Sequence, residues 1–156
     1  MLEFLYEDSN NNSEFINQMI EYIDNMVGNI YWIISDLDII ANDREDFITN
    51  KPMFSEKVFN FENLVERENG VYINTKELSE IIFETRTIRK AALACYKNDS
   101  PKLKEYIPLV ESNLDKIKST HAILEIRILD GDLIFIIGNN GINLESIKSK
   151  FNMYSK

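Results

Sequence analysis

The sequence predicts an α/β (α+β) fold, in which helices pack against a central antiparallel β-sheet. Two apolar runs flank Asp130-Gly131 within the stretch AILEIRILDGDLIFIIG, and this pattern is the strongest local signal for a β-hairpin. Apolar residues recur every three or four positions over residues 15–27, as in an amphipathic helix. Residues 30–34 are aromatic and β-branched, which favours a central strand.

The predicted hairpin has a defined register if Asp130 and Gly131 alone form its loop, as in a type I′ turn. Strand side chains alternate between the two faces of a sheet. One face would then hold three pairs, namely Ile128 with Leu133, Ile126 with Phe135 and Leu124 with Ile137. The other face would pair Arg127 with Ile134 and Glu125 with Ile136. We expect this second face to be amphipathic and only partly covered.

Local patterns predict several further elements. Residues 2–6 favour a short strand, and the polar run 10–13 offers an N-cap for the helix that follows. Gly28 is well placed to end that helix. The strand that starts at Ile30 continues, or restarts, through residues 37–40. Residues 71–73 favour another strand, and Asn74 with Glu77 resembles a capping box at the start of a helix reaching about Arg86.

The second half of the chain is less uniform. Residues 88–96 carry alanines that favour helix by propensity. We predict a strand there instead, because a helix running on from Asn74 to Lys97 would lack an apolar face in its second half. Residues 98–101 favour a turn, residues 109–118 a short helix, and Asn143 can cap a final helix. Residues 41–69 give no clear pattern, although their phenylalanines must pack somewhere.

Length and composition indicate one domain spanning residues 1–156. A chain of 156 residues buries roughly two-thirds of its unfolded surface and needs no covalent cross-links. A single cysteine excludes an internal disulfide framework and suits a reducing compartment. The sequence shows neither a secretory leader pattern nor an apolar run near the ~20 residues of a membrane-spanning helix. We therefore expect a cytoplasmic protein.

The net charge of −9 is unevenly distributed. Residues 1–68 hold 15 acidic and 4 basic side chains, a balance of −11, whereas residues 69–156 have a balance of +2. Such an acidic half repels nucleic acid and anionic membranes, since phosphate binding depends on clustered lysine and arginine. It would attract a basic protein and accelerate their encounter. The alternative explanation for the acidic charge is that it only keeps the protein soluble.

The densest carboxylate group is Asp36-Leu37-Asp38 with Asp43, Glu45 and Asp46 close behind. Three interpretations remain open for it. Oxygen-rich clusters bind Ca²⁺ or Mg²⁺, but the glycine that an EF-hand loop requires is missing. The cluster can be a solvated acidic loop after a strand. It can also be a negative patch complementary to lysine and arginine on another protein.

No pattern defines an active site. Cys95 and His121 are the only residues of their kinds, and nucleophilic catalysis would need them to converge with a third group. We expect a small buried residue at Cys95 and a surface or edge position for His121. A structural zinc site built from histidine and cysteine is excluded, and Gly138–Gly141 lacks the spacing of a phosphate loop. We predict no catalytic residue, no cofactor and no metal. Trp32 is predicted to be a core residue.

The order of these segments resembles that of small acidic immunity proteins from bacterial polymorphic-toxin and contact-dependent growth inhibition systems. The segments that carry the resemblance are IYWIISDLDI, VYINTKELSEII, ALACYK, AILEIRILDGDLIFIIGNN and NLESIKSKF. The resemblance covers most of the chain and contains no diagnostic motif.

What the resemblance implies is a cytoplasmic inhibitor that binds one cognate toxin domain, often a basic nuclease, and occludes its active site. Such an inhibitor needs no catalytic residue. From charge alone, the candidate partner-binding residues are Asp36, Asp38, Asp43, Glu45, Asp46, Glu62, Glu66 and Glu68. Phe54 or Phe59 would be the apolar anchors.

Two other functions remain open at this point. A regulatory module could form a homodimer through the half-covered face of Glu125, Arg127, Ile134 and Ile136. An enzyme would need a pocket built from Arg86, Arg89, His121 and scattered carboxylates, and it has the weakest support because no catalytic constellation accompanies these residues.

Overall fold

A computed structural model describes residues 1–42, 44–46, 51–53, 55–97 and 121–152; within 44–46 and 51–53 it describes the backbone only. The helices are α1 (Ser13–Val27), α2 (Glu56–Glu68), α3 (Thr75–Phe83) and α4 (Leu144–Lys150). The strands are β1 (Leu2–Leu5), β2 (Ile30–Ala41), β3 (Arg44–Asp46), β4 (Lys51–Met53), β5 (Val71–Asn74), β6 (Thr85–Lys97), β7 (Leu124–Leu129) and β8 (Leu133–Gly138).

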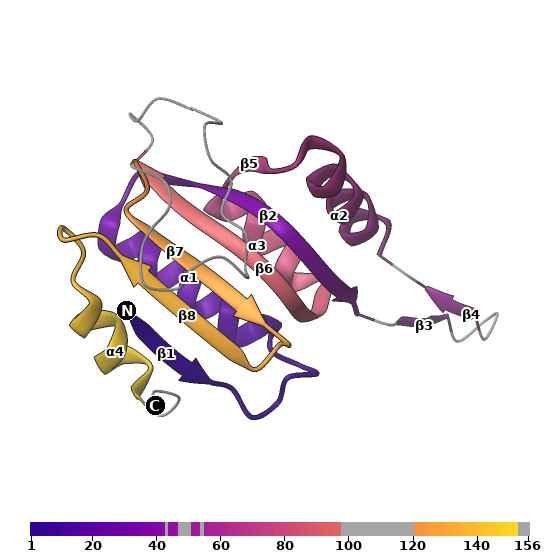
Figure 1. Cartoon of the computed structure of the whole chain (residues 1–156). Coiled ribbons are helices and arrows are strands. Elements are labelled where there is room, and N and C mark those ends of the chain that lie inside the picture. Colours follow the sequence, from indigo (N-terminus) through magenta and orange to yellow (C-terminus); the bar gives the residue numbers. More distant parts are fainter. Residues whose placement is uncertain (43, 47–50, 54, 98–120, 153–156) are drawn as a thin grey trace.

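Six strands form one antiparallel sheet in the order β1-β8-β7-β6-β2-β5, and β3 pairs with β4 in a separate small hairpin. Figure 1 shows the long strands β2 and β6 side by side in this sheet and the β3–β4 hairpin projecting beyond the end of β2. The expected α+β class, with helices packed on an antiparallel sheet, is confirmed.

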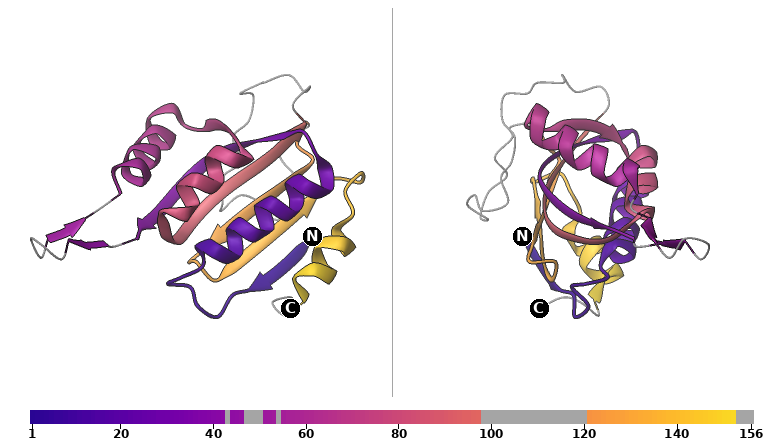
Figure 2. Two further views of the ribbon diagram at one scale, coloured as in Figure 1. Left: turned by 180° about the vertical axis from the view of Figure 1, so that it is seen from behind. Right: turned by 90° about the vertical axis from the view of Figure 1, so that its right-hand side faces the viewer.

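Helices α1 and α3 lie side by side on one face of the sheet (Figure 2). They cover a core in which Trp32 is fully buried and donates its indole N–H to Thr75 Oγ1 at 3.0 Å. Helix α4 closes the core near β1, where Phe151 makes edge-to-face contacts with Phe4, Phe15 and Tyr22. Burying these aromatic and aliphatic side chains is the main stabilising contribution of this layer.

The side chain of Asn12 joins three distant parts of the fold. It is fully buried just before α1. Its amide nitrogen donates to the carbonyl oxygens of Ile88 and Gly131, at 2.8 and 2.6 Å, and its Oδ1 accepts from the Ile88 N–H at 2.8 Å. These bonds satisfy main-chain groups that would otherwise be buried without partners. They tie the first helix to β6 and to the loop of the β7–β8 hairpin.

The predicted register of the β7–β8 hairpin is wrong by one residue. The loop has three residues rather than two, because Leu129 pairs with Leu133. Both Asp130 and Gly131 in this loop have positive φ. Three-residue loops are the next most common hairpin connection after two-residue ones. Arg127 therefore pairs with Phe135, and Glu125 pairs with Ile137. Leu133, Phe135 and Ile137 do not share a face with Leu124, Ile126 and Ile128.

The second face of the sheet is also buried, contrary to expectation. Glu125 and Arg127 have no exposed side-chain surface, and Arg127 donates from Nε and Nη2 to Oε2 of Glu125 at 3.1 and 2.5 Å. Ala92 and Ala94 lie opposite them on β6, where small side chains leave room for the two long ones. Ile134 and Ile136 belong to the helix-covered core. The four residues suggested for a homodimer face are thus all fully buried.

Most other sequence predictions are confirmed. Elements α1, β5, β6 and α4 lie where local patterns placed them, and Asn74 and Asn143 cap their helices through Oδ1. Helix α3 starts as predicted but ends at Phe83 rather than near Arg86, because β6 begins at Thr85. Helix α2 was not predicted. The turn at 98–101 and the helix at 109–118 fall outside the described residues. In the part of the chain that the structure describes, no helix has the length and apolarity needed to cross a membrane.

The buried ion pair gives a direct prediction for stability. Arg127→Met removes the buried cation that faces the Glu125 carboxylate, and we expect the free energy of unfolding to fall by about 3–5 kcal/mol. Adding Glu125→Leu removes the buried carboxylate as well and should restore most of the loss. Urea denaturation followed by Trp32 fluorescence measures both variants. The control Arg67→Met breaks an exposed pair with Glu68 and should cost under ~1 kcal/mol. Equal losses in the single and double variants would contradict the prediction.

A candidate protein-docking cleft between α2 and strand β2

Strand β2 extends well beyond the strand that pairs with its outer edge. Strand β5 covers only residues 31–34 of β2, while β6 pairs with β2 along its whole length on the other side. After Ser35 the β2–β6 register shifts, and Asp36 has a φ of 53°. This is a β-bulge, which bends a strand and increases its twist, at a residue type that tolerates positive φ better than most. The rest of β2 therefore diverges from β5.

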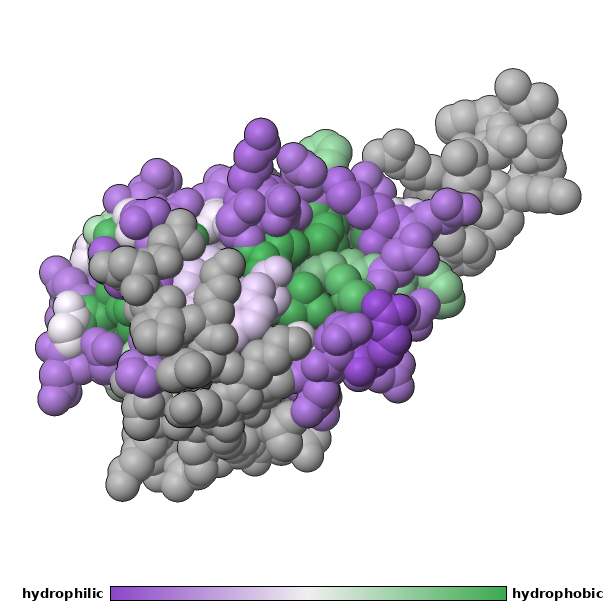
Figure 3. Space-filling view, turned by 90° about the horizontal axis from the view of Figure 1, so that it is seen from above, coloured by the Kyte–Doolittle hydropathy of each residue, from purple (hydrophilic) through white to green (hydrophobic). Residues whose placement is uncertain are grey.

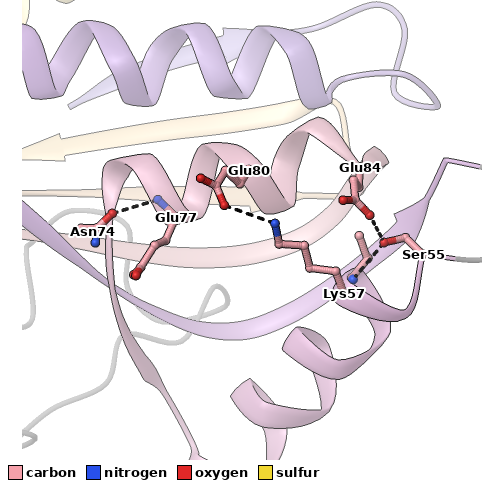
Figure 4. Close-up of polar contacts among 7 residues, drawn as sticks. Ser55, Lys57, Asn74, Glu77, Glu80 and Glu84 are labelled. Atoms are coloured by element: carbon pink, nitrogen blue, oxygen red, sulfur yellow. Dashed lines mark hydrogen bonds and ion pairs between the residues drawn. The ribbon is translucent and has the colours of Figure 1, made fainter.

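Helix α2 packs along the part of β2 that extends beyond β5 (Figure 1). Its N-cap is Ser55, whose Oγ accepts from the Val58 N–H at 3.3 Å and donates to Oε2 of Glu84. Lys57 pairs with Glu80 of α3 at 3.3 Å (Figure 4). The buried side chains of α2 are Val58, Phe61 and Val65. These contacts hold the helix against the sheet and leave a cleft between α2 and β2.

The half of the cleft nearest the bulge is acidic. It has a volume of about 500 Å³. Carboxylates enter it from both walls, Asp36 and Asp38 from β2 and Glu62 and Glu66 from α2. The remaining lining residues are Leu37, Asn63, Val65 and Asn69. We call this region the acidic half of the cleft.

Two basic residues of β6 neutralise part of this charge. Lys90 pairs with Asp36 at 3.1 Å, and Arg89 pairs with Asp38 at 2.8 Å. Both pairs are partly or largely exposed, so each contributes little to stability. Four carboxylates against two cations leave the acidic half with a negative balance. Such a surface attracts lysine and arginine side chains and steers the approach of a basic partner.

Glu62 lies at the centre of the cleft and contacts its strand wall. Its Oε1 accepts a hydrogen bond from the Ile39 N–H at 3.2 Å. Partial burial raises the pKa of the Glu62 carboxyl above its usual range, and the neighbouring charges of Asp38 and Glu66 act in the same direction. The Ile39 N–H and Arg89 oppose this rise without cancelling it. The charged form of Glu62 is therefore less stable in this cleft than in water.

The other half of the cleft is apolar and has a volume of about 520 Å³. Its strand wall is formed by residues 39–41, and its helix wall includes Val58 and Phe59. Glu62 lines both halves, while Ser55 and Glu56 contribute polar atoms to the apolar half. The Phe59 ring is 62 % exposed. Seen from above, hydrophobic surface lies between hydrophilic borders (Figure 3). We call this region the apolar half of the cleft.

The structure brings together four of the eight predicted partner-binding residues, namely Asp36, Asp38, Glu62 and Glu66. Glu68 is exposed at the end of α2 and pairs with Arg67 at 3.1 Å instead of lining the cleft. Glu45 and Asp46 lie on β3, opposite Pro52 and Lys51. Asp43 falls outside the described residues, as does Phe54. Phe59, the other suggested anchor, lines the apolar half.

Sequence reasoning missed the helix that forms one wall. The signal was present, because Ser55 precedes apolar residues at Val58, Phe61 and Val65, which is helical spacing after an N-cap. No local sequence pattern could predict the hydrogen bond between Glu62 and the Ile39 N–H, because the two residues are 23 positions apart.

The residues considered for catalysis do not converge. Cys95 is fully buried in the helix-covered core, and burial raises the pKa of its thiol. His121 is exposed and adjoins the last part of β6, because the Ile123 N–H donates to the Cys95 carbonyl. Arg86 and Arg89 lie in the first part of β6, toward the opposite end of that strand. Across the described ranges, no group of three or more acidic, histidine or cysteine side chains is arranged to hold a metal ion.

Comparison of the chain with known protein families, with characterised proteins and with solved structures finds no match.

The raised pKa of Glu62 predicts that Glu62→Gln increases the stability of the folded protein by an amount that depends on pH. Glutamine keeps an acceptor for the Ile39 N–H but carries no charge. Because the folded-state pKa of Glu62 lies above its unfolded value, the wild-type protein loses stability as the pH rises through that folded pKa. Urea denaturation between pH 4 and pH 8 should show the variant gaining stability relative to wild type as the pH rises. Glu7→Gln, at an exposed loop position, controls for the loss of a surface charge, and an identical pH trend in both variants would argue against the prediction.

Proposed function

We propose that this protein is a cytoplasmic immunity protein that binds a basic toxin domain, such as a nuclease, and blocks its active site. The cleft between α2 and β2 supports this proposal most directly. It gathers Asp36, Asp38, Glu62 and Glu66 on two facing walls and places an apolar half beside them. Interfaces commonly combine such an apolar centre with charged surroundings.

The charge distribution agrees with this role. A toxin that acts on nucleic acid needs clustered lysine and arginine to hold phosphates. An inhibitor with an acidic cleft offers those side chains carboxylates in place of phosphates, and charge complementarity raises the association rate and favours the correct partner. The balance of −11 over residues 1–68 extends the attraction beyond the cleft itself.

Co-purification with the product of the gene immediately upstream tests the proposal. A tagged copy of this protein is expressed with that product, whose catalytic activity has been abolished by mutation. We expect a stable complex that weakens as the salt concentration rises, since salt screens exposed charges. The absence of a complex, together with an upstream gene unrelated to toxins, would remove the support for an immunity function.

Charge reversal in the cleft should slow formation of that complex. Glu66→Lys changes an exposed position in the acidic half, and we expect the association rate constant to fall by about two- to tenfold at low salt. The difference should shrink at ~0.5 M salt. Stopped-flow mixing measures both rates. Glu7→Lys makes the same change in net charge away from the cleft and should have a smaller effect. Charge-reversing substitutions at Asp43, Glu45 and Asp46 test in the same way whether the acidic segment after β2 accelerates association.

A further inference from the structure

We propose that the cleft accepts an extended segment of the partner as an added strand on the open edge of β2. The segment carries basic residues in the acidic half and apolar residues in the apolar half. This inference deepens the proposed function, on which the basic character of the partner rests, by naming the kind of segment that is bound and its mode of binding.

The edge of β2 that faces the cleft is open. Among the described residues, β5 is the strand on that side, and it ends its pairing at Ile34. Residues 37–41 therefore have strand β6 on one side and the cleft on the other. An exposed strand edge presents main-chain N–H and C=O groups that can pair with another chain. The open stretch of five residues is about 17 Å long, which suits a short added strand.

The Ile39 N–H shows that a main-chain donor of this edge points into the cleft. Its acceptor is the Glu62 carboxylate, at 3.2 Å. Charged side chains over an open edge are a common protection against unwanted strand pairing. A carbonyl oxygen of an incoming strand could replace the carboxylate at this donor. Glu62 is partly buried, and its charged form is disfavoured there. Moving the Glu62 carboxylate into water therefore offsets part of the cost of breaking its hydrogen bond to the Ile39 N–H.

The two walls of the cleft select the side chains of the added strand. A strand paired with β2 would lie along the cleft, and in peptide binding by strand addition side-chain pockets supply the specificity. Asp36, Asp38 and Glu66 would meet lysine or arginine at one end. Val58 and Phe59 would meet apolar side chains at the other. Each half has a volume of about 500 Å³, within the range of ligand pockets.

Synthetic peptides test this mode of binding directly. The probe is a ten-residue peptide with three alternating lysines in one half and three alternating valines in the other, separated by threonines. A second peptide has the same composition in reverse order, because an added strand can run parallel or antiparallel to β2. A third and a fourth replace, in each sequence, a threonine next to the central lysine–valine pair by proline, which removes a main-chain donor while keeping charge and apolar content. Binding is followed by the amide NMR signals of residues 37–41.

We expect one of the two orders to bind and to shift the amide signals of residues 37–41. Its proline version should bind at least ~fivefold more weakly, the loss of about one hydrogen bond. Phe59→Ala should weaken binding, whereas Phe83→Ala, which removes a 77 % exposed ring from outside the cleft, should not. Failure of both orders to shift these signals at millimolar concentration overturns the inference. Equal binding of the proline versions overturns it as well, since attraction by charge alone would then explain the result.

These outcomes separate the inference from the proposed function. Peptide binding at β2 without any complex with the upstream gene product would retain the strand-accepting cleft and reject the immunity function. A toxin complex that leaves the amide signals of residues 37–41 unchanged would retain the immunity function and reject strand addition.

Discussion

The pairing of β2 with β6 is the constraint on which the other features depend. These two strands are the longest in the sheet and lie next to each other in it. Their ladder carries the core residue Trp32 opposite Cys95, and its bulge at Asp36 redirects the rest of β2 away from β5. The bulge therefore sets where the outer edge of the sheet opens and where α2 can lie beside it. The cleft lies beside the part of β2 in which the β2–β6 ladder is irregular.

The sheet is buried on both faces, and the second face shows how a charged pair is accommodated there. Glu125 and Arg127 are two residues apart on β7 and so project on the same side. Removing two charges from water is costly, and their close mutual contact compensates for part of this cost. Ala92 and Ala94 on the neighbouring strand provide the space that this contact needs. A buried ion pair restricts the alternatives open to a strand, since a one-residue slip would move both charges to the face packed with isoleucines.

Much of the fold could be predicted from local sequence, because caps, periodicity and turn residues act over a few positions. Asp130-Gly131 located the hairpin, and Asn74 with Glu77 located the start of α3. The prediction of the hairpin register failed because Asp132 belongs to the loop. No local pattern shows whether Asp132 is a loop residue or the first residue of β8. Two of the four carboxylates of the acidic half, Asp36 and Asp38, were found as neighbours in sequence. That Glu62 and Glu66 face them across the cleft depends on how α2 packs, which sequence spacing does not encode.

The hydrogen bonds of Asn12 have a consequence for the order of events during synthesis. Its amide bonds to Gly131, 119 positions later in the chain, and β1 pairs with β8 in the same region. A ribosome releases the N-terminal segment long before its partners have emerged, so the first strand must wait for nearly the whole chain. Contacts between such distant positions slow folding. During that interval the acidic, lysine-free start of the chain stays in water, where its charges oppose premature association.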